Sequence, residues 1–159
     1  MQGIGVRKPE KDFMIIRKAK FWFLLLTLAS CKNDLSDDPI PFSPFNDVVI
    51  DLSFPEFLSL NTNGGSKELN NKGVRGIIVY RLDAKTYLAY ERNCSYHPND
   101  ACATVNVHSS GLYLIDPCCG STFNFFDGNP SGGIAWRPLR QYRTQLVGTT
   151  LTITSDITN

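Results

Sequence analysis

Four cysteines provide most of the reactive chemistry in the second half of this 159-residue chain. Cys94 and Cys102 lie in one polar segment, and Cys118 and Cys119 are neighbours in a second. Paired cysteines form disulfides in an oxidising compartment, and as thiolates they bind soft metal ions. Four cysteines allow three pairings, and a bridge between the adjacent Cys118 and Cys119 would be strained. The residues therefore predict either one of two disulfide pairings or a metal site.

The fifth cysteine, Cys31, belongs to a targeting motif. From Arg17 the chain reads RKAKFWFLLLTLASC, a positively charged stretch before an apolar run that is too short to span a bilayer. This pattern is typical of a secretory signal peptide, and Leu28–Ser30 before the cysteine resemble a lipobox. We expect residues 1–30 to be removed, with Met14 as a possible true start, and Cys31 to carry lipid. The alternatives are an ordinary signal peptide with a chance cysteine, or a short buried helix.

The expected lipid defines the domain organisation and the location. Two or three acyl chains anchor a protein to a membrane without a transmembrane helix. Residues 31–46 are rich in Pro, Asp, Ser and Asn, which predicts a flexible stalk, and residues 47–159 form the folded domain. Lys32 stands where an inner-membrane retention signal usually has Asp, so we expect an outer-membrane lipoprotein of the cell envelope. Its partners would be the membrane, through lipid on Cys31, and an envelope protein that the sequence does not identify.

Charge and motif content disfavour several functions. The chain has 16 Lys and Arg against 15 Asp and Glu, a balance that disfavours a nucleic-acid partner. We expect Arg137, Arg140 and Arg143 to form a solvated edge. A hydrolase is disfavoured because the chain has no nucleophile-elbow serine motif and only two histidines. Adjacent cysteines also differ from the C-x-x-C arrangement of thiol–disulfide exchange proteins. We therefore predict that the protein is not an enzyme.

After residue 46 the sequence predicts an all-β fold. Short runs rich in Val, Ile, Tyr, Phe and Thr alternate with Gly, Pro, Asn and Asp, and no convincing helical period is present. We expect an antiparallel β-sandwich or small barrel, with hairpin turns at 82–85 and 147–150 and a surface loop at 61–72. The expected strands are 48–54, 74–82, 86–91, 103–107, 112–115, 122–126, 142–147 and 151–154.

The two cysteine segments resemble a known pair of loops. They read CSYHPNDAC at 94–102 and DPCCGSTF at 116–123. These are similar to the loops C-x-H-x-x-C and C-P-C-H-G-S-x-F of Rieske-type iron–sulfur domains, and the resemblance covers residues 74–154. It implies a Rieske-like β fold with a two-loop cluster-binding subdomain, a [2Fe–2S] cluster held by two cysteines and two histidines, and a role in electron transfer.

The chain departs from the family at the cluster ligands. Asp116 stands where the family has a cysteine ligand, and Cys119 stands where it has a histidine ligand. The first loop keeps Cys94, but His97 follows it after two residues instead of one. The resemblance implies that Cys102 and Cys118 correspond to the cysteines that form a disulfide between the loops in many Rieske proteins.

Two interpretations of the altered ligand set remain. Without a metal, Cys94 and Cys119 would form a second disulfide. Alternatively, Cys94, His97, Asp116 and Cys119 would hold zinc or an altered iron site, since two sulfurs, one nitrogen and one oxygen make a plausible tetrahedral set. We therefore expect a non-catalytic binding or structural module without the standard cofactor. The alternative is an electron-transfer protein that binds a [2Fe–2S] cluster or another metal through non-standard ligands.

Overall fold

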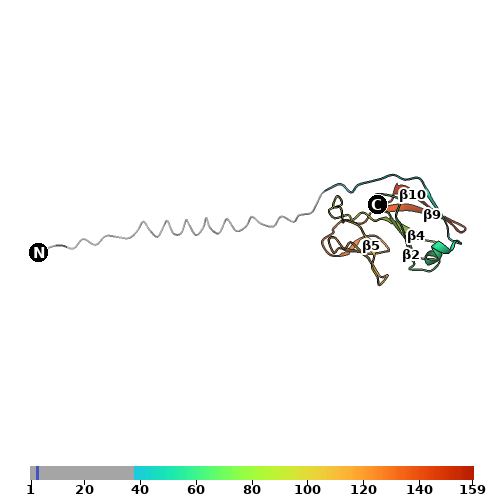
Figure 1. The fold of residues 1–159 in the computed structure, drawn as a ribbon. Coiled ribbons are helices and arrows are strands. Elements are labelled where there is room, and N and C mark those ends of the chain that lie inside the picture. Colours follow the sequence, from blue (N-terminus) through green and yellow to red (C-terminus); the bar gives the residue numbers. More distant parts are fainter. Residues whose placement is uncertain (1–2, 4–37) are drawn as a thin grey trace. The chain divides into compact units, whose positions relative to one another are not determined.

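The computed structural model describes residue 3 and residues 38–159 (Figure 1). Apart from Gly3, the predicted signal peptide lies outside the described residues, and so does Cys31. Among the described residues, no helix is long and apolar enough to cross a membrane. The fold described below belongs to the compact unit Leu35–Asn159.

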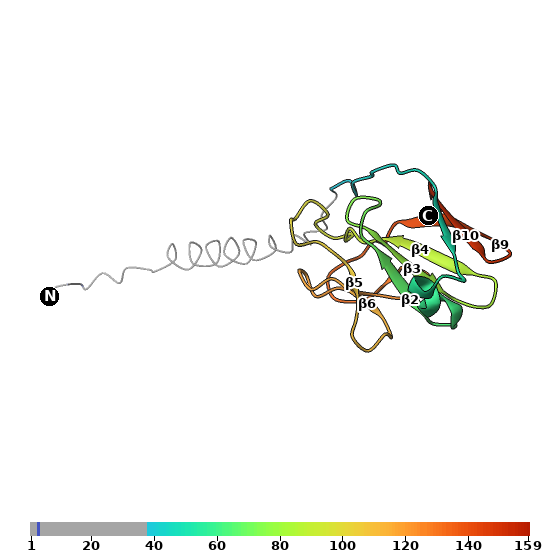
Figure 2. The ribbon, with the colours of Figure 1, turned by 45° about the vertical axis from the view of Figure 1, so that its right-hand side comes forward.

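The larger sheet has six antiparallel strands in the order β1-β10-β9-β4-β3-β2 (Figures 1 and 2). Consecutive strands form hairpins, with β3 paired to β4 and β9 paired to β10. Gly148 supports the turn between β9 and β10, because it has a φ of +61° that side chains disfavour. The strands are β1 (Val48–Asp51), β2 (Ser66–Leu69), β3 (Ile77–Arg81), β4 (Tyr87–Glu91), β9 (Gln141–Val147) and β10 (Thr150–Ile157).

The smaller sheet has four short antiparallel strands in the order β5-β6-β7-β8. They are β5 (Asn106–Val107), β6 (Leu114–Ile115), β7 (Thr122–Phe123) and β8 (Pro130–Gly132). An isolated antiparallel bridge pairs Asn93 with Thr104 within the segment that leads from the larger sheet to β5. The smaller sheet therefore carries the connection between β6 and β7, which holds two of the four cysteines.

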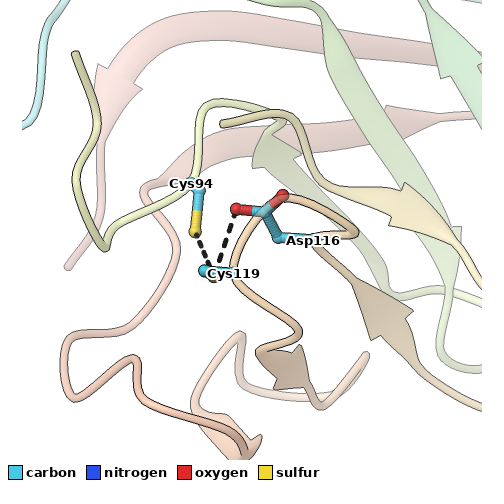
Figure 3. Close-up of side chains that lie close together, drawn as sticks. All are labelled: Cys94, Asp116 and Cys119. Atoms are coloured by element: carbon cyan, nitrogen blue, oxygen red, sulfur yellow. Dashed lines mark hydrogen bonds between the residues drawn. The ribbon is translucent and has the colours of Figure 1, made fainter. Parts of the chain in front are cut away.

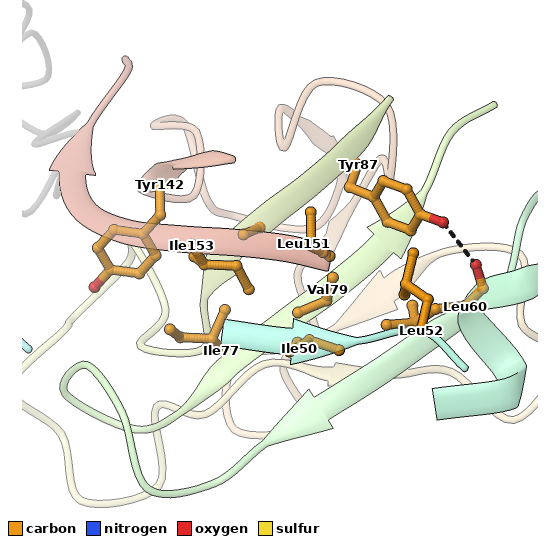
Figure 4. Packing of buried hydrophobic residues seen from close by; sticks show 10 residues of the cluster. Ile50, Leu52, Leu60, Ile77, Val79, Tyr87, Tyr142, Leu151 and Ile153 are labelled. Carbon is orange, nitrogen blue, oxygen red and sulfur yellow. Dashed lines mark hydrogen bonds between the residues drawn. The ribbon is translucent and has the colours of Figure 1, made fainter. Parts of the chain in front are cut away.

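Two apolar clusters hold the fold together, one on each side of β3. Ile77 and Val79 belong to the first cluster, whereas Ile78 belongs to the second. Figure 4 shows the first cluster, where the Tyr87 hydroxyl donates a hydrogen bond to the carbonyl oxygen of Leu60 at 3.0 Å. Because successive side chains of a strand point to opposite faces, β3 is buried on both faces. The second cluster also holds Tyr90, Cys94, Leu114, Phe123 and Leu139.

The all-β, antiparallel fold predicted from the sequence is confirmed, with three corrections in the strand assignment. The segment 61–72 is not only a loop, because Ser66–Leu69 pairs with β3 as an edge strand. This strand contains charged residues, so it was not predicted from apolar runs, although charged side chains are common on edge strands. Pro130–Gly132 pairs with β7 and was also missed. A 3-10 helix, η2 (Pro55–Asn61), follows β1 where the first expected strand continued to residue 54.

Residues 38–46 lie against the β domain, although the sequence places them in a flexible stalk. The Phe45 ring packs edge-on against the ring of Tyr142, with centroids 5.0 Å apart. Arg137 donates a hydrogen bond to the carbonyl oxygen of Asp38 at 2.8 Å, and Arg140 donates one to that of Ile40 at 2.7 Å. Arg137 and Arg140 thus hold this segment although we expected them to be solvated, whereas Arg143 is exposed as expected.

Candidate metal centre

Two loops form the site. Loop 1 (residues 92–105) follows β4, and the Cys94 N–H donates to the carbonyl oxygen of Ala103 at 3.1 Å, which closes the loop. Loop 2 (residues 116–121) joins β6 to β7 as a tight turn, where the Gly120 N–H donates to the carbonyl oxygen of Asp116 at 2.8 Å. Gly120 has a φ of +71°, so a residue without Cβ suits this turn.

A disulfide ties the two loops together. Cys102 in loop 1 and Cys118 in loop 2 are bonded, with their Cα atoms 5.5 Å apart. The two cysteines are 16 positions apart along the chain. A cross-link that closes a loop of this size lowers the entropy of the unfolded chain and stabilises the fold by about 3 kcal/mol. The bridge therefore fixes the distance between the loops that carry the remaining cysteines.

Three side chains converge between the loops, namely Cys94, Asp116 and Cys119 (Figure 3). Their donor atoms all lie within 4.8 Å of one another. The two Sγ atoms are 4.0 Å apart, and Cys119 Sγ is 3.3 Å from Asp116 Oδ2. Cys94 and Asp116 are fully buried, whereas Cys119 is half-buried. The site is thus a compact group of two thiols and one carboxylate, closed on one side and partly open at Cys119.

Hydrogen bonds orient the acidic member of the group. The backbone N–H of Cys118 donates to Asp116 Oδ1 at 2.9 Å, which leaves Oδ2 to face Cys119. No basic side chain forms an ion pair with Asp116 among residues 38–159. Buried charged groups in proteins normally have an ion-pair partner or coordinate a metal ion. The geometry therefore places a carboxylate that lacks an ion-pair partner next to two thiols.

The buried thiol of Cys94 is held in its protonated form in the absence of a cation. Burial raises the pKa of Cys94 well above its usual range, and a hydrogen bond with Asp116 raises it further. A bound cation reverses this effect, because a coordinated thiol is deprotonated. Cys94 is therefore no reactive nucleophile, and its chemistry is that of a structural thiol or of a metal ligand.

Ser121 is the fourth polar side chain beside the group. Its Oγ accepts hydrogen bonds from the backbone N–H groups of Ile134, at 3.2 Å, and Ala135, at 2.9 Å. The same oxygen lies 3.1 Å from Cys119 Sγ. In this arrangement the Cys119 thiol donates to the serine oxygen, and the serine hydroxyl can donate to the sulfur only when Cys119 is a thiolate.

His97 does not join the group, although the sequence makes it a candidate ligand. Its ring packs edge-on against the ring of Tyr96, with centroids 4.2 Å apart. Its backbone has a φ of +44°, a left-handed conformation in loop 1. Within the described part of the chain, the group of convergent donors contains no imidazole.

Sequence reasoning missed the residues that position loop 1. Arg75 donates hydrogen bonds to Asn93 Oδ1 and to the carbonyl oxygens of Asp100 and Ala101, so one guanidinium group holds both ends of the loop. The buried carboxylate of Glu91, which precedes the loop, accepts hydrogen bonds from four donors. These are the backbone N–H groups of Val74, Arg75 and Asn93 and the hydroxyl group of Tyr142. In the sequence, the special role of this region is indicated only by the polar triplet Glu91-Arg92-Asn93 at the end of an apolar strand.

The donor set does not fit the cluster that the sequence resemblance implies. A Rieske cluster takes two cysteines on one iron and two histidines on the other. The convergent group offers two thiols and one carboxylate, and the described histidines lie outside it. The ligands of a two-iron cluster also lie at opposite ends of that cluster, whereas these three donors face one point. The residues present therefore do not assemble a standard Rieske site.

Comparisons with known proteins give matches among solved structures only. No family model and no curated protein matches the chain. One similar structure is a chain of the complex of reduced oxygenase and oxidised ferredoxin in carbazole 1,9a-dioxygenase. It is 18% identical with a TM-score of 0.46, and the match covers 62% of this chain and 87% of that chain.

Another similar structure is the ferredoxin of carbazole 1,9a-dioxygenase from Nocardioides aromaticivorans IC177. It is 19% identical with a TM-score of 0.41, and the match covers 60% of this chain and 91% of that chain. These identities are too low to transfer ligands residue by residue.

Proposed function

We propose that this chain is a Rieske-like domain, tethered to the cell envelope by lipid on Cys31, that acts as a non-catalytic binding or structural module. The observation that carries the proposal is the convergent group itself. Cys94, Asp116 and Cys119 converge between the two loops whose sequences resemble the cluster-binding loops of Rieske domains, and no imidazole is among them.

The Rieske-like part of the proposal is supported by the arrangement of the loops. Loop 1 follows the central strand β4, and loop 2 connects two strands of the smaller sheet. The Cys102–Cys118 bridge joins them, and loop 2 retains the order Pro-Cys-x-Gly-Ser of the family motif. The scaffold that presents a cluster is thus retained, whereas the cluster ligands have changed.

A structural role is supported by the way in which the loops are held. The disulfide and the hydrogen bonds of Arg75 fix loop 1 without any cofactor. A [2Fe–2S] cluster in other proteins of this type also links two loops, and covalent and polar contacts serve the same purpose here. The function would then depend on what the rigid loop tips and the domain surface bind.

Electron transfer is the second candidate function. It is favoured by one observation, the close approach of two thiols in a mostly buried site, because iron–sulfur clusters are held by cysteine thiolates. This candidate needs non-standard ligands, with Asp116 and Cys119 replacing a cysteine and a histidine.

The two candidates differ in iron and sulfide content. The full chain is produced in a host that assembles iron–sulfur clusters and is purified without oxygen, and iron and acid-labile sulfide are then quantified. The proposed function predicts far less than one iron and one sulfide per chain. About two irons and two sulfides per chain, the composition of the cluster, would establish the electron-transfer alternative instead.

A matched variant shows that the assay detects a cluster when ligands allow one. The triple substitution Tyr96→His, Asp116→Cys and Cys119→His restores the family's histidine position in loop 1 and its two ligands in loop 2. An increase of iron and sulfide in this variant, against none in the parent chain, supports the assignment of the loops. About two irons and two sulfides in both proteins would contradict the proposed loss of the ligands, and none in either would contradict the assignment of the loops.

A further inference from the structure

We infer that Cys94, Asp116 and Cys119 bind a single thiophilic divalent metal ion, with zinc as the best match, through two thiolates and one carboxylate. The inference rests on the proposed function, because it requires a site without a [2Fe–2S] cluster. It goes beyond that function by assigning a bound metal ion to these three side chains. His97 takes no part in this site, and the fourth position is left to water.

The distances between the donor atoms fit one tetrahedral ion. Two thiolates bound to zinc at about 2.3 Å lie about 3.8 Å apart, and a thiolate and a carboxylate oxygen lie about 3.6 Å apart. The Sγ atoms of Cys94 and Cys119 are 4.0 Å apart, and Cys119 Sγ is 3.3 Å from Asp116 Oδ2. A disulfide requires about 2.05 Å between the sulfurs. The distance between the two sulfurs is therefore that of two ligands of one metal ion and not that of a disulfide.

The charges around the group favour a cation. Asp116 is fully buried and has no ion-pair partner among residues 38–159. When zinc binds, two metal–sulfur bonds form, the two thiol protons leave to solvent, and no electron is transferred. Two thiolates and one carboxylate then surround the ion, and the ion supplies the positive charge that the buried carboxylate lacks.

Neighbouring residues already hold the donors in a ligand-like arrangement. The Cys118 N–H fixes one oxygen of Asp116 and leaves the other to face the centre. The Ser121 hydroxyl group, whose acceptor sites are engaged by Ile134 and Ala135, has its proton free to donate to a thiolate at Cys119. Outer hydrogen bonds of this kind orient ligands and strengthen metal binding. The donor atoms are therefore held in position before any ion arrives.

The exposure of the three residues leaves one side for a fourth ligand. Cys94 and Asp116 are fully buried, but Cys119 is half-buried. Zinc with three protein ligands keeps a water molecule in the fourth position. We place this water on the side of Cys119, where the group meets solvent.

Cobalt is the probe for this site, because tetrahedral Co²⁺ is coloured and occupies zinc sites. The full chain is purified without oxygen, treated with a mild reductant that keeps Cys94 and Cys119 as thiols, and titrated with Co²⁺ and then with Zn²⁺. We expect one Co²⁺ per chain, with the absorption bands of tetrahedral cobalt and a sulfur-to-cobalt charge-transfer band. Zinc should displace the cobalt and remove both features.

Variants assign the ligands. Cys119→Ser should weaken Co²⁺ binding at least tenfold and remove about half of the charge-transfer intensity, because one of two thiolates is lost. Asp116→Asn should weaken binding at least tenfold but keep the charge-transfer intensity at saturation. The control is His97→Asn, since asparagine tolerates a positive φ, and it should leave affinity and spectrum unchanged. Far-UV circular dichroism checks that each variant is folded.

Two results would overturn the inference. One is a reduced, folded and cluster-free chain that binds no Co²⁺, and the other is a cobalt spectrum that Cys119→Ser does not change. In both cases the proposed function survives, because it requires only the absence of a cluster. Stoichiometric iron and sulfide in the same preparation would instead contradict the proposed function.

Discussion

The carboxylate of Asp116 lies 3.3 Å from the sulfur of Cys119, and the two residues belong to one tight turn. They are three positions apart in loop 2, which begins at the end of β6 and returns to β7. The contact places a carboxylate and a thiol beside Cys94, at the two positions where the loop motif that this sequence resembles has a cysteine and a histidine.

The loop-bridging disulfide should contribute strongly to stability. We expect Cys102→Ser to lower the free energy of unfolding by about 3 kcal/mol, because the unfolded chain regains the freedom of the segment between the two cysteines. Denaturant unfolding measures this change. The parent chain with the bridge reduced is the control and should lose a similar amount. A loss within about 0.5 kcal/mol in both would contradict the structural role of the bridge.

Arg75 should act as a clamp on loop 1. Arg75→Met removes its hydrogen bonds to Asn93, Asp100 and Ala101 while keeping an apolar stem of similar length. We expect a stability loss of about 1–2 kcal/mol and faster amide hydrogen exchange in loop 1. The control is Arg143→Met, since the ion pair of Arg143 with Asp156 is largely exposed and should contribute at most about 0.5 kcal/mol. Unchanged exchange in loop 1 would contradict the clamp.

The two buried tyrosines Tyr142 and Tyr90 should respond differently to loss of their hydroxyl groups. The Tyr142 hydroxyl donates to buried Glu91 at 2.7 Å, so Tyr142→Phe leaves the carboxylate with one donor fewer and should destabilise the fold by about 1–3 kcal/mol. The Tyr90 hydroxyl is buried without a hydrogen-bond partner in the described part of the protein. Tyr90→Phe should therefore be neutral or stabilising. Thermal unfolding of both variants tests the contrast, and equal losses would contradict it.

Arg140 should hold the segment that precedes β1. It donates to the carbonyl oxygen of Ile40 and stacks over the ring of Phe42, with its guanidinium carbon 5.1 Å from the ring centroid. Arg140→Ala should make residues 38–46 a site of rapid limited proteolysis, because the segment loses both contacts. The parent chain should resist cleavage there. Rapid cleavage of both proteins would support the interpretation of this segment as a flexible stalk, and resistance of both would contradict the role of Arg140.

Lipid attachment at Cys31 is tested by labelling. Cells that produce the full chain are fed a radioactive or clickable fatty acid, and we expect label on the parent chain and none on Cys31→Ser. The variant should also leave the membrane fraction, because the lipid is the expected anchor. Equal labelling of the two proteins would contradict lipidation at this residue.

The sequence predicted the fold wherever strands were apolar. The strands Ile77–Arg81 and Tyr87–Glu91 stand out as runs of apolar residues that are buried on both faces, and the final hairpin stands out because its alternating apolar residues face the first cluster. The edge strand Ser66–Leu69 did not, because its pairing depends on backbone hydrogen bonds to β3 and its own side chains are mostly polar. Gly65 is part of this geometry, since a Cβ there would lie 1.7 Å from the carbonyl oxygen of Ser59. The sequence alone does not reveal such a close approach between two backbone segments.

The site was predictable in its residue types and less so in its arrangement. Loop motifs identified all of the cysteines and Asp116, since they are unusual residues at recognisable spacing. The position of His97 depends on its left-handed backbone and its packing against Tyr96, which spacing does not reveal. The roles of Arg75 and Ser121 depend on contacts between segments far apart in the chain.

Native mass spectrometry of the full chain, purified without oxygen from cells supplied with zinc and iron, tests the central claim most directly. One mass reports the disulfide, any metal ion and any inorganic sulfide together. We expect a chain with one disulfide and one zinc ion, without inorganic sulfide. A mass that includes two irons and two sulfides would contradict this expectation and would make this protein an electron carrier with altered ligands.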